Sequence, residues 1–271
     1  MTRKVALANT LHLPFMLLGF KGLESVVRLI DESVSCHWLT LPTKPSTLSL
    51  FLIAFIGHLL IFWCIGGILV LLSYYNLTTK IQQSKTPRPL DGILLILINS
   101  ALSILLSFWT LKVLPDSSFD SRSSSCVLHL IIFVVIEEIA FYSIHRLGHH
   151  PLIYRFIHKV HHRFRSPSAW HAIYAHPIEH VALNLFPLLM PPVLLRTNFQ
   201  VFLLWLSMAQ ISTLVAHCGF IVPGVPTNPM HDLHHSEFCG NFGVLGILDW
   251  ALGTLQTPYN KKGRVPDHRV E

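Results

Sequence analysis

The chain alternates between long apolar runs and short polar connections. The clearest run, residues 48–73, contains no Asp, Glu, Lys or Arg. A helix needs about 20 apolar residues to cross the hydrocarbon core of a bilayer, which is about 30 Å thick. Residues 48–73 are therefore predicted to span a membrane, and the runs at 90–114 and 126–144 are predicted to do the same.

Two later apolar runs, 181–195 and 199–222, are separated by only three residues. Prolines interrupt the first of them, and a proline inside a helix removes a backbone hydrogen bond. We interpret the pair as a helical hairpin, and the sequence leaves open whether it crosses the bilayer fully. The apolar stretch at 5–20 is interpreted as an interfacial helix, with a signal peptide and a weak span as alternatives.

Composition supports this pattern. Hydrophobic residues make up 51% of the chain and charged residues only 13%, and the mean hydropathy is +0.51. A typical soluble domain has about 25% charged residues. The chain is therefore predicted to be an all-α integral membrane protein.

Charge predicts the orientation. The net charge is +6, but the basic residues are scattered over loops, which argues against nucleic acid as a partner. The connection at 74–89 contains Lys80, Lys85 and Arg88 and no acidic residue, so the positive-inside rule places it in the cytoplasm. The run at 126–144 then also ends on the cytoplasmic side. Because the hairpin leaves and returns to that side, the histidines that precede and follow it are predicted to face one another.

Histidines are concentrated on both sides of the hairpin. Residues three or four apart share a face of a helix, so each of three clusters is predicted to present its imidazoles toward one point. The clusters, together with one further histidine at the end of the last apolar run, give these candidate metal ligands: His145, His149, His158, His161, His162, His217, His231, His234 and His235.

These are too many ligands for one metal ion. A single zinc takes four ligands, and structural zinc sites usually include cysteine, which the clusters lack. The residues therefore predict a dinuclear site, and they leave its metal open because imidazole suits zinc, copper, iron and nickel. The five cysteines contain no Cys-x-x-Cys pair, so the sequence indicates neither a thiolate zinc site nor a disulfide framework.

Other polar residues near the clusters have two open interpretations. Four histidines are either ligands or hydrogen-bonding partners of ligands: His150, His171, His176 and His180. Glu137 and Glu138 either pair with Arg146 or a lysine at the membrane surface, or support the metal ligands. His58 is interpreted as structural.

Five segments that contain these histidines resemble, in order, the successive motifs of the fatty acid hydroxylase superfamily, and within it most nearly the C4-methylsterol oxidases. The segments are 142–150, 158–162, 175–180, 217–223 and 231–235. The likeness covers residues 137–254 and includes the closing segments at 241–243 and 249–254. It divides the chain into an N-terminal region with two spans (1–125), a hydroxylase domain (126–258) and a short polar tail (259–271).

The resemblance implies a multi-pass protein of the endoplasmic reticulum membrane, with about four transmembrane helices below a cytosolic helical domain. The histidines would bind two iron ions as a non-haem di-iron monooxygenase, with no catalytic residue besides the metal ligands. Dioxygen would be the cosubstrate, and electrons would come from NAD(P)H through cytochrome b5 and its reductase. The substrate would be a sterol or fatty-acyl lipid, with C4-methylsterol oxidation in sterol biosynthesis as the first choice.

Other activities share parts of this pattern. A desaturase, a fatty acid hydroxylase or a cholesterol 25-hydroxylase would use the same clusters, which do not distinguish between them. A non-catalytic metal-binding or transport protein would be expected to carry polar ligands inside several spans, whereas residues 48–73 offer only His58. A zinc hydrolase would be expected to carry a His-Glu-x-x-His motif, which the sequence lacks.

Overall fold

The computed structural model describes residues 46–81, 87–114, 123–222 and 227–256. Within these ranges all regular elements are helices, and the only pairing of β type is an isolated bridge between Lys80 and Phe220. The all-α prediction is thereby confirmed for the described part of the chain. The segment at 5–20 and the tail at 259–271 lie outside it.

The first three predicted spans are present as helices. The first combines α2 (Thr47–His58), the π-helical η1 (Leu59–Ile65) and α3 (Gly66–Tyr74) into one rod. Its start is capped by Ser46, whose side chain accepts a hydrogen bond from the Ser49 backbone nitrogen at 3.1 Å. The second and third spans are α4 (Ile93–Val113) and α5 (Ser123–Gly148).

The predicted hairpin forms two further long helices. The sequence had left open whether it crosses the bilayer fully. Its first arm joins α7 (Pro177–Glu179), the π-helical η4 (His180–Leu185) and α8 (Phe186–Leu194), and its second arm is α9 (Phe199–Ala216). Both arms are long and apolar enough to cross a membrane, so the described residues hold five candidate spans. The protein is therefore a multi-pass membrane protein with one more candidate span than the four expected.

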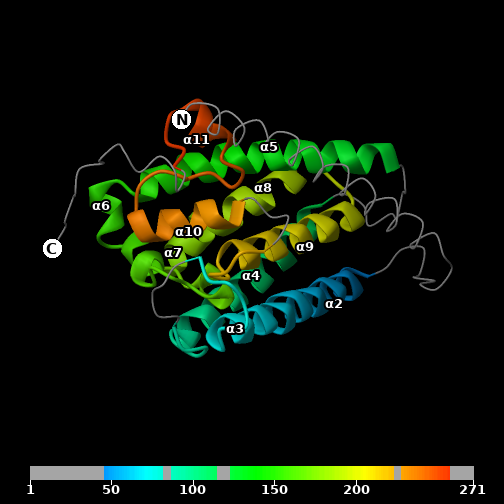
Figure 1. Cartoon of the computed structure of the whole chain (residues 1–271). Coiled ribbons are helices and arrows are strands. Elements are labelled where there is room, and N and C mark those ends of the chain that lie inside the picture. The colour runs from blue at the N-terminus through cyan, green and yellow to red at the C-terminus, as the bar shows by residue number, and fades with distance from the viewer. Residues whose placement is uncertain (1–45, 82–86, 115–122, 223–226, 257–271) are drawn as a thin grey trace.

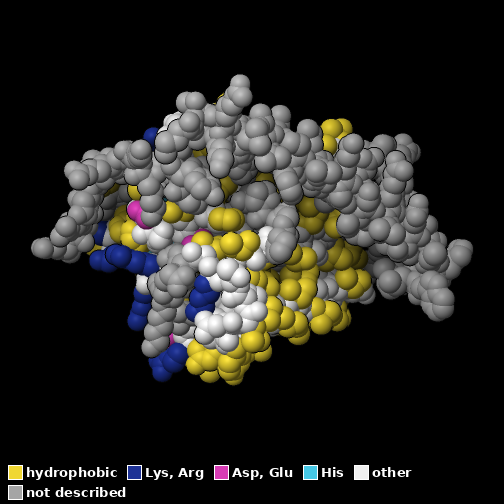
Figure 2. Space-filling model, in the orientation of Figure 1, with side chains coloured by type: hydrophobic (Ala, Val, Ile, Leu, Met, Phe, Trp, Pro, Cys, Tyr) yellow, Lys and Arg dark blue, Asp and Glu magenta, His cyan; other side chains and the backbone are white. Residues whose placement is uncertain are grey.

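The long helices form a bundle, and the short helices gather toward one end of it (Figure 1). The short helices are α6 (Pro151–Tyr154), α10 (Thr227–Glu237) and α11 (Ile247–Ala251). Apolar side chains such as Leu52, Leu60 and Leu94 remain exposed on the long helices, as expected for surfaces that face lipid. Figure 2 shows hydrophobic side chains over one part of the surface and Lys and Arg side chains toward the other end.

One buried side chain in the bundle holds the segment that follows η3 (Ala169–Ile173). Asn99, on α4, donates hydrogen bonds to the backbone oxygens of Ile173 and Ala175, each at 2.8 Å. Trp170 in η3 also donates to the Phe62 backbone oxygen in η1 at 3.0 Å. These bonds fix the histidine-bearing end of the molecule to the spans.

Replacing Asn99 tests this link. Asn99→Leu leaves two carbonyl oxygens without their partner, and an unsatisfied buried group costs about 1–3 kcal/mol. We expect a lower thermal unfolding midpoint in detergent and a lower metal content. Thr110→Val on the same helix is the control, because Thr110 bonds only to the Leu106 oxygen of its own helix among the bonds seen here. Equal midpoints for the two variants would contradict this role for Asn99.

Candidate metal centre

Four segments bring the nine predicted ligands together. His145 lies in the last turn of α5, His149 directly follows this helix, and His217 directly follows α9. The short 3₁₀ helix η2 (His158–Arg163) and the helix α10 each supply three histidines. Between α5 and η2 the chain turns through α6, which begins with Pro151 and is capped by His150.

The nine side chains form two groups. Within each group the candidate ligand atoms all lie within 4.8 Å of one another. The first histidine group contains His145, His149, His158, His162 and His234, and the second histidine group contains His161, His217, His231 and His235. No other histidine of the described residues joins either group. Two separate groups agree with the predicted dinuclear site, while the ligand roles themselves stay predictions.

The expectation that each cluster points toward one site holds for His145 and His149, which share the first group, but is wrong for the other two clusters. The neighbours His161 and His162 enter different groups, and so do His234 and His235. Successive side chains are about 100° apart around an α-helix and about 120° apart around a 3₁₀ helix. A pair of adjacent histidines can therefore serve two metal positions, which the spacing rule for a shared face does not anticipate.

Hydrogen bonds at Nδ1 decide which ring nitrogen faces the centre. In the first group, Nδ1 of His145 lies 2.8 Å from the Phe242 oxygen, and Nδ1 of His234 lies 2.7 Å from the Gly240 oxygen. Nδ1 of His158 lies 2.7 Å from a carboxylate oxygen of Glu179. Carbonyl and carboxylate oxygens only accept hydrogen bonds, so these rings carry hydrogen at Nδ1 and, when neutral, a lone pair at Nε2.

The second histidine group follows the same rule. Nδ1 of His161 donates to the Tyr174 oxygen at 3.2 Å, and Nδ1 of His217 donates to the Thr213 oxygen at 2.9 Å. Metal-binding histidines usually donate their other ring nitrogen to a carbonyl or carboxylate in this way, which fixes the orientation of the ring.

The Nε2 atoms then face one another at short range. Nε2 of His158 lies 2.9 Å from Nε2 of both His149 and His162, and Nε2 of His234 lies 3.2 Å from the same two atoms. Because His158 and His234 each present a lone pair, at most two of these four contacts can contain a proton. A cation at the centre would instead accept all four lone pairs.

Two further observations fit a metal. Nε2 of His145 and both ring nitrogens of His235 are buried and have no hydrogen-bond partner among the described residues. Nε2 of His231 lies 2.9 Å from Nε2 of His217, whose Nδ1 already carries the hydrogen. Buried polar atoms are normally paired, so the arrangement suits ions that would bind these nitrogens.

Burial also keeps the rings neutral. It lowers the pKa of His158, His217 and His234 to about 3 and that of His161 to about 4. For His231 the pKa lies well below its usual value because of burial and the neighbouring histidines. A neutral imidazole is the form that binds metal, so the site is ready for metal at neutral pH.

Carboxylates hold the loop that orients two of the rings. Glu138 accepts hydrogen bonds from the backbone nitrogens of Val244 and Leu245, each at 2.8 Å, and from that of Leu248 at 3.1 Å. Asp249 accepts from the nitrogens of Phe242 and Gly243 at 2.9 and 2.7 Å. The Phe242 oxygen in turn holds His145. Glu138 thus supports the centre through the backbone.

Arg146, the alternative partner considered for Glu137 and Glu138, does not pair with Glu138. Arg146 donates to the Tyr142 hydroxyl at 2.9 Å. Glycine is needed where the carboxylates approach the loop, since a Cβ on Gly243 would lie 2.6 Å from Oε1 of Glu138. The roles of Asp249 and Glu179 were not predicted, although both residues lie in segments of the family likeness, 249–254 and 175–180. That likeness is the signal that could have identified them.

The four histidines whose role the sequence left open, as ligands or as partners of ligands, lie outside both groups. His150 and His176 cap α6 and α7. His171 bonds to Ser168 and to the Asp91 oxygen, and burial lowers its pKa to about 4. His180 bonds through both ring nitrogens to Ser103 and Asn184. These four rings thus form hydrogen bonds with protein groups that lie outside the two histidine groups.

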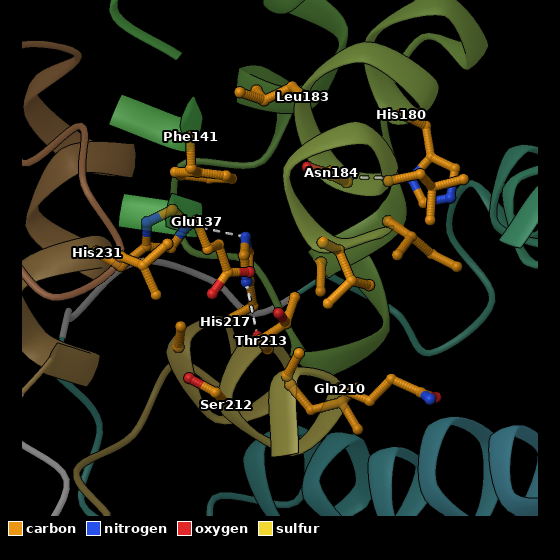
Figure 3. A pocket seen from close by; sticks show the side chains of 18 of the residues that line it. Glu137, Phe141, His180, Leu183, Asn184, Gln210, Ser212, Thr213, His217 and His231 are labelled. Carbon is orange, nitrogen blue, oxygen red and sulfur yellow. Dashed lines mark hydrogen bonds between the residues drawn. The ribbon is translucent and has the colours of Figure 1, made fainter. Parts of the chain in front are cut away.

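A cavity of about 160 Å³ adjoins both histidine groups, since His145 of the first group lines it as well as His161 of the second. His217 and His231 line it together with Glu137 and Phe141 (Figure 3). Leu183 and other apolar side chains continue its wall between the spans. The histidines therefore meet an apolar space that is enclosed by the membrane-spanning helices.

Residues 130–254, which contain all nine histidines, match the family model described as fatty acid hydroxylase. The similarity to the fatty acid hydroxylase family therefore covers slightly less than half of the chain. Fatty acid hydroxylase domain-containing protein 2 from Homo sapiens is 43% identical over 128 residues, which are 47% of this chain and 38% of that protein. Methylsterol monooxygenase 1 from Rattus norvegicus is 38% identical over 116 residues, 40% of this chain and 39% of that protein.

A third relative extends the similarity beyond the hydroxylase domain. Methylsterol monooxygenase 2-1 from Arabidopsis thaliana is 28% identical over 263 residues, which are 83% of this chain and 95% of that protein. The chain spans about two fifths of the length of the first relatives it matches. No solved structure matches the chain. The family model and these named relatives thus agree that the similarity is to hydroxylases and monooxygenases.

Acid should weaken the centre. The unfolded chain binds protons at its histidines below about pH 6.5, whereas the folded protein keeps His158, His161 and His234 unprotonated down to about pH 3–4. The free energy of unfolding therefore falls as the pH drops through this window, by about 1.4 kcal/mol per pH unit for each such histidine. The thermal unfolding midpoint of the purified protein in detergent, measured between pH 7.5 and 5, should fall steeply below about pH 6.5. A midpoint that does not change with pH would contradict this prediction.

Glu138→Gln should loosen the loop while leaving every histidine in place. The amide loses part of a charge-assisted set of hydrogen bonds, each worth about 1.5–3 kcal/mol. We expect a lower unfolding midpoint and less metal per chain by elemental analysis. Ser143→Ala is the control on α5, because Ser143 bonds to the Ile139 oxygen of its own helix. Wild-type metal content in Glu138→Gln would refute the supporting role.

Proposed function

We propose that the protein is a dioxygen-dependent monooxygenase that hydroxylates a membrane lipid. The observation that carries this proposal is the pair of all-histidine groups with converging Nε2 atoms, both of which contribute a side chain to the wall of a mainly apolar cavity between the spans. A metal centre beside an apolar space between membrane-spanning helices suits oxidation of a lipid.

The metal we propose is iron, with one ion held by each histidine group. The donor set alone suits several metals, and similarity to the fatty acid hydroxylase family favours iron. When bound, iron would supply the redox chemistry with dioxygen that breaking an unactivated C–H bond requires. The two groups would hold it through five and four imidazoles.

The protein's own part is to position the substrate and to exclude water. Phe141, Leu183 and Leu206 line the cavity. A hydrocarbon chain that enters the cavity therefore exchanges its contacts with lipid for contacts with these apolar side chains. Such contacts hold the carbon to be oxidised close to the second histidine group, and fixed positioning of the reactants is a large source of rate enhancement.

The first substrate to test is a C4-methylsterol. Two of the relatives are named methylsterol monooxygenases, one of which aligns over almost its full length. The alternatives within the proposal are another lipid hydroxylation and a desaturation, which differ in product and not in metal centre. The relative named fatty acid hydroxylase domain-containing protein 2 supports a hydroxylase without specifying the lipid.

The proposed location is the endoplasmic reticulum membrane, with the metal centre facing the cytosol. The exposed basic residues Arg155, Lys159 and Arg163 near the histidine groups support this orientation under the positive-inside rule. They also suit an acidic electron-transfer partner, for which we propose cytochrome b5 with its NAD(P)H-dependent reductase.

A sterol profile tests the function. A yeast strain without its own C4-methylsterol oxidase would express this chain, the ligand variants His161→Ala and His162→Ala, or the control His176→Ala. His161 and His162 belong to different histidine groups, whereas His176 caps α7. We expect 4,4-dimethylsterols to fall with the wild type and the control only, as measured by mass spectrometry.

Other outcomes would change the assignment. If 4,4-dimethylsterols stay high with well-expressed wild type, the C4 position is wrong, and the search passes to hydroxylated or desaturated lipids that disappear in both ligand variants. If no lipid differs between the wild type and the ligand variants, the protein is not an oxygenase under these conditions, and the proposed function fails.

A further inference from the structure

The two adjacent acidic residues of α5 have different surroundings. Glu138 is buried and accepts hydrogen bonds from three backbone nitrogens of residues 244–248. Glu137 keeps some accessible surface and lines the cavity, and it forms no hydrogen bond or ion pair with a residue in the described ranges. Successive side chains on an α-helix point about 100° apart. One carboxyl group therefore meets the loop, and the other meets the cavity.

A carboxyl group without a partner is costly in this place. Polar groups between membrane-spanning helices cost free energy unless they are paired, and those that face the bundle interior commonly mark a binding site or a path. Glu137 is the only acidic residue among the described residues that line the cavity, and none of them is Lys or Arg. A ligand that donates a hydrogen bond to Glu137 would offset the cost.

The ring and amide side chains across the cavity are already paired with one another or with hydroxyl groups. The pairs are His180 with Ser103, His180 with Asn184, His58 with Ser100, and His58 with Gln210. Figure 3 shows His180 and Gln210 on the side of the cavity away from Glu137 and His231. The carboxyl group that lacks a partner thus lies on the side that the histidines line.

Helix geometry relates Glu137 to the metal centre. Glu137, Phe141 and His145 are spaced four residues apart on α5, so they share one face of the helix, and all three line the cavity. The centroids of the Phe141 and His145 rings are 5.1 Å apart. Eight residues correspond to about 12 Å along the helix axis, which leaves room for a hydrogen bond and a few covalent bonds. A group held at Glu137 is therefore only a few bonds from the atom that meets the centre.

The charges around Glu137 narrow the chemistry of its ligand. When ionised, its carboxyl group repels carboxylates and phosphates, and metal ions in the two histidine groups would repel an ammonium group. An uncharged donor is left. A hydroxyl group brings a single polar atom into the cavity, and a carboxyl group accepts a hydrogen bond from it in either protonation state.

We propose that Glu137 accepts a hydrogen bond from a hydroxyl group of the substrate and thereby turns the adjacent part of the molecule toward the metal centre. This inference rests on the proposed lipid oxidation and names its substrate class, a lipid alcohol whose hydroxyl-bearing carbon is bonded to the carbon that carries the oxidised group. A C4-methylsterol meets this description, because its hydroxyl group is on C3 and its methyl groups are on C4.

The size of the cavity agrees with an anchor close to the reacting carbon. Its volume of about 160 Å³ is below the roughly 300–1,000 Å³ of most ligand pockets. It therefore suits the hydroxyl-bearing ring of a sterol, and the rest of the sterol would extend between the spans. The anchored group and the oxidised carbon then belong to the same end of the molecule.

Binding of matched sterols tests the contact without requiring turnover. The full chain in detergent, loaded with iron, would be titrated with tritiated 4,4-dimethylcholestanol in competition with the unlabelled alcohol, its methyl ether or the deoxy compound 4,4-dimethylcholestane. The alcohol should bind about tenfold more tightly than either competitor, which corresponds to one net hydrogen bond. Glu137→Met removes the acceptor at similar size, and this preference should then fall to about twofold or less.

Two further variants separate binding from structure. Glu137→Gln keeps an amide oxygen as acceptor and should keep most of the preference. Ser143→Ala on the same helix should leave it unchanged, because Ser143 does not line the cavity. Equal affinity of the wild type for the alcohol and 4,4-dimethylcholestane would overturn the proposal, whatever the variants do. An unchanged preference in a folded Glu137→Met protein that retains its iron would overturn it as well.

The 3-amino analogue of the same sterol tests the kind of donor. Near neutral pH it should bind more weakly than the alcohol, because its ammonium group would approach the metal ions. Tighter binding of the amine that is lost in Glu137→Met would overturn the assignment of a hydroxyl group.

The same preparations separate this inference from the proposed function when reductant and dioxygen are added. Selective binding of the alcohol that depends on Glu137, without an oxidised product, upholds the contact and counts against C4-methylsterol oxidation. Equal oxidation by the wild type and Glu137→Met, with equal affinity for the alcohol and the deoxy compound, upholds lipid oxidation and overturns the contact.

Discussion

Imidazole rings whose lone pairs converge on one point repel one another, and a positive charge between them removes that repulsion. The Nε2 atoms of His158 and His234 both carry lone pairs and share the same two neighbours at 2.9–3.2 Å. Burial opposes protonation of these rings, so a metal ion is the charge that suits the site. The packing of the histidine-bearing end, and the hydrogen bonds that hold each ring, follow from this requirement.

The supporting hydrogen bonds connect distant parts of the chain. The carbonyl oxygens that orient His145 and His234 come from the loop after α10, and Glu138 and Asp249 hold parts of that loop through backbone amides. Glu138 lies on α5, one of the long apolar helices. A carboxylate there is costly to bury, and its several backbone donors offset that cost.

The location of the centre at the end of the bundle also determines what can reach it. The cavity is lined by histidines of both groups and extends into the space between the spans, and none of the described residues in its wall is Lys or Arg. A molecule that reaches the histidines through this cavity therefore meets a mainly apolar wall made by the membrane-spanning helices.

Local patterns in the sequence determined the membrane spans and the nine candidate ligands, because hydrophobic length and residue type are properties of short segments. The same patterns could not assign His161 and His162 to different groups, or show that His180 is bonded to Ser103. Nor could they show that both arms of the hairpin are long enough to span, since prolines in α8 weaken the local signal. The tertiary structure decided these points, because the partner of a side chain is set by where helices from distant segments meet.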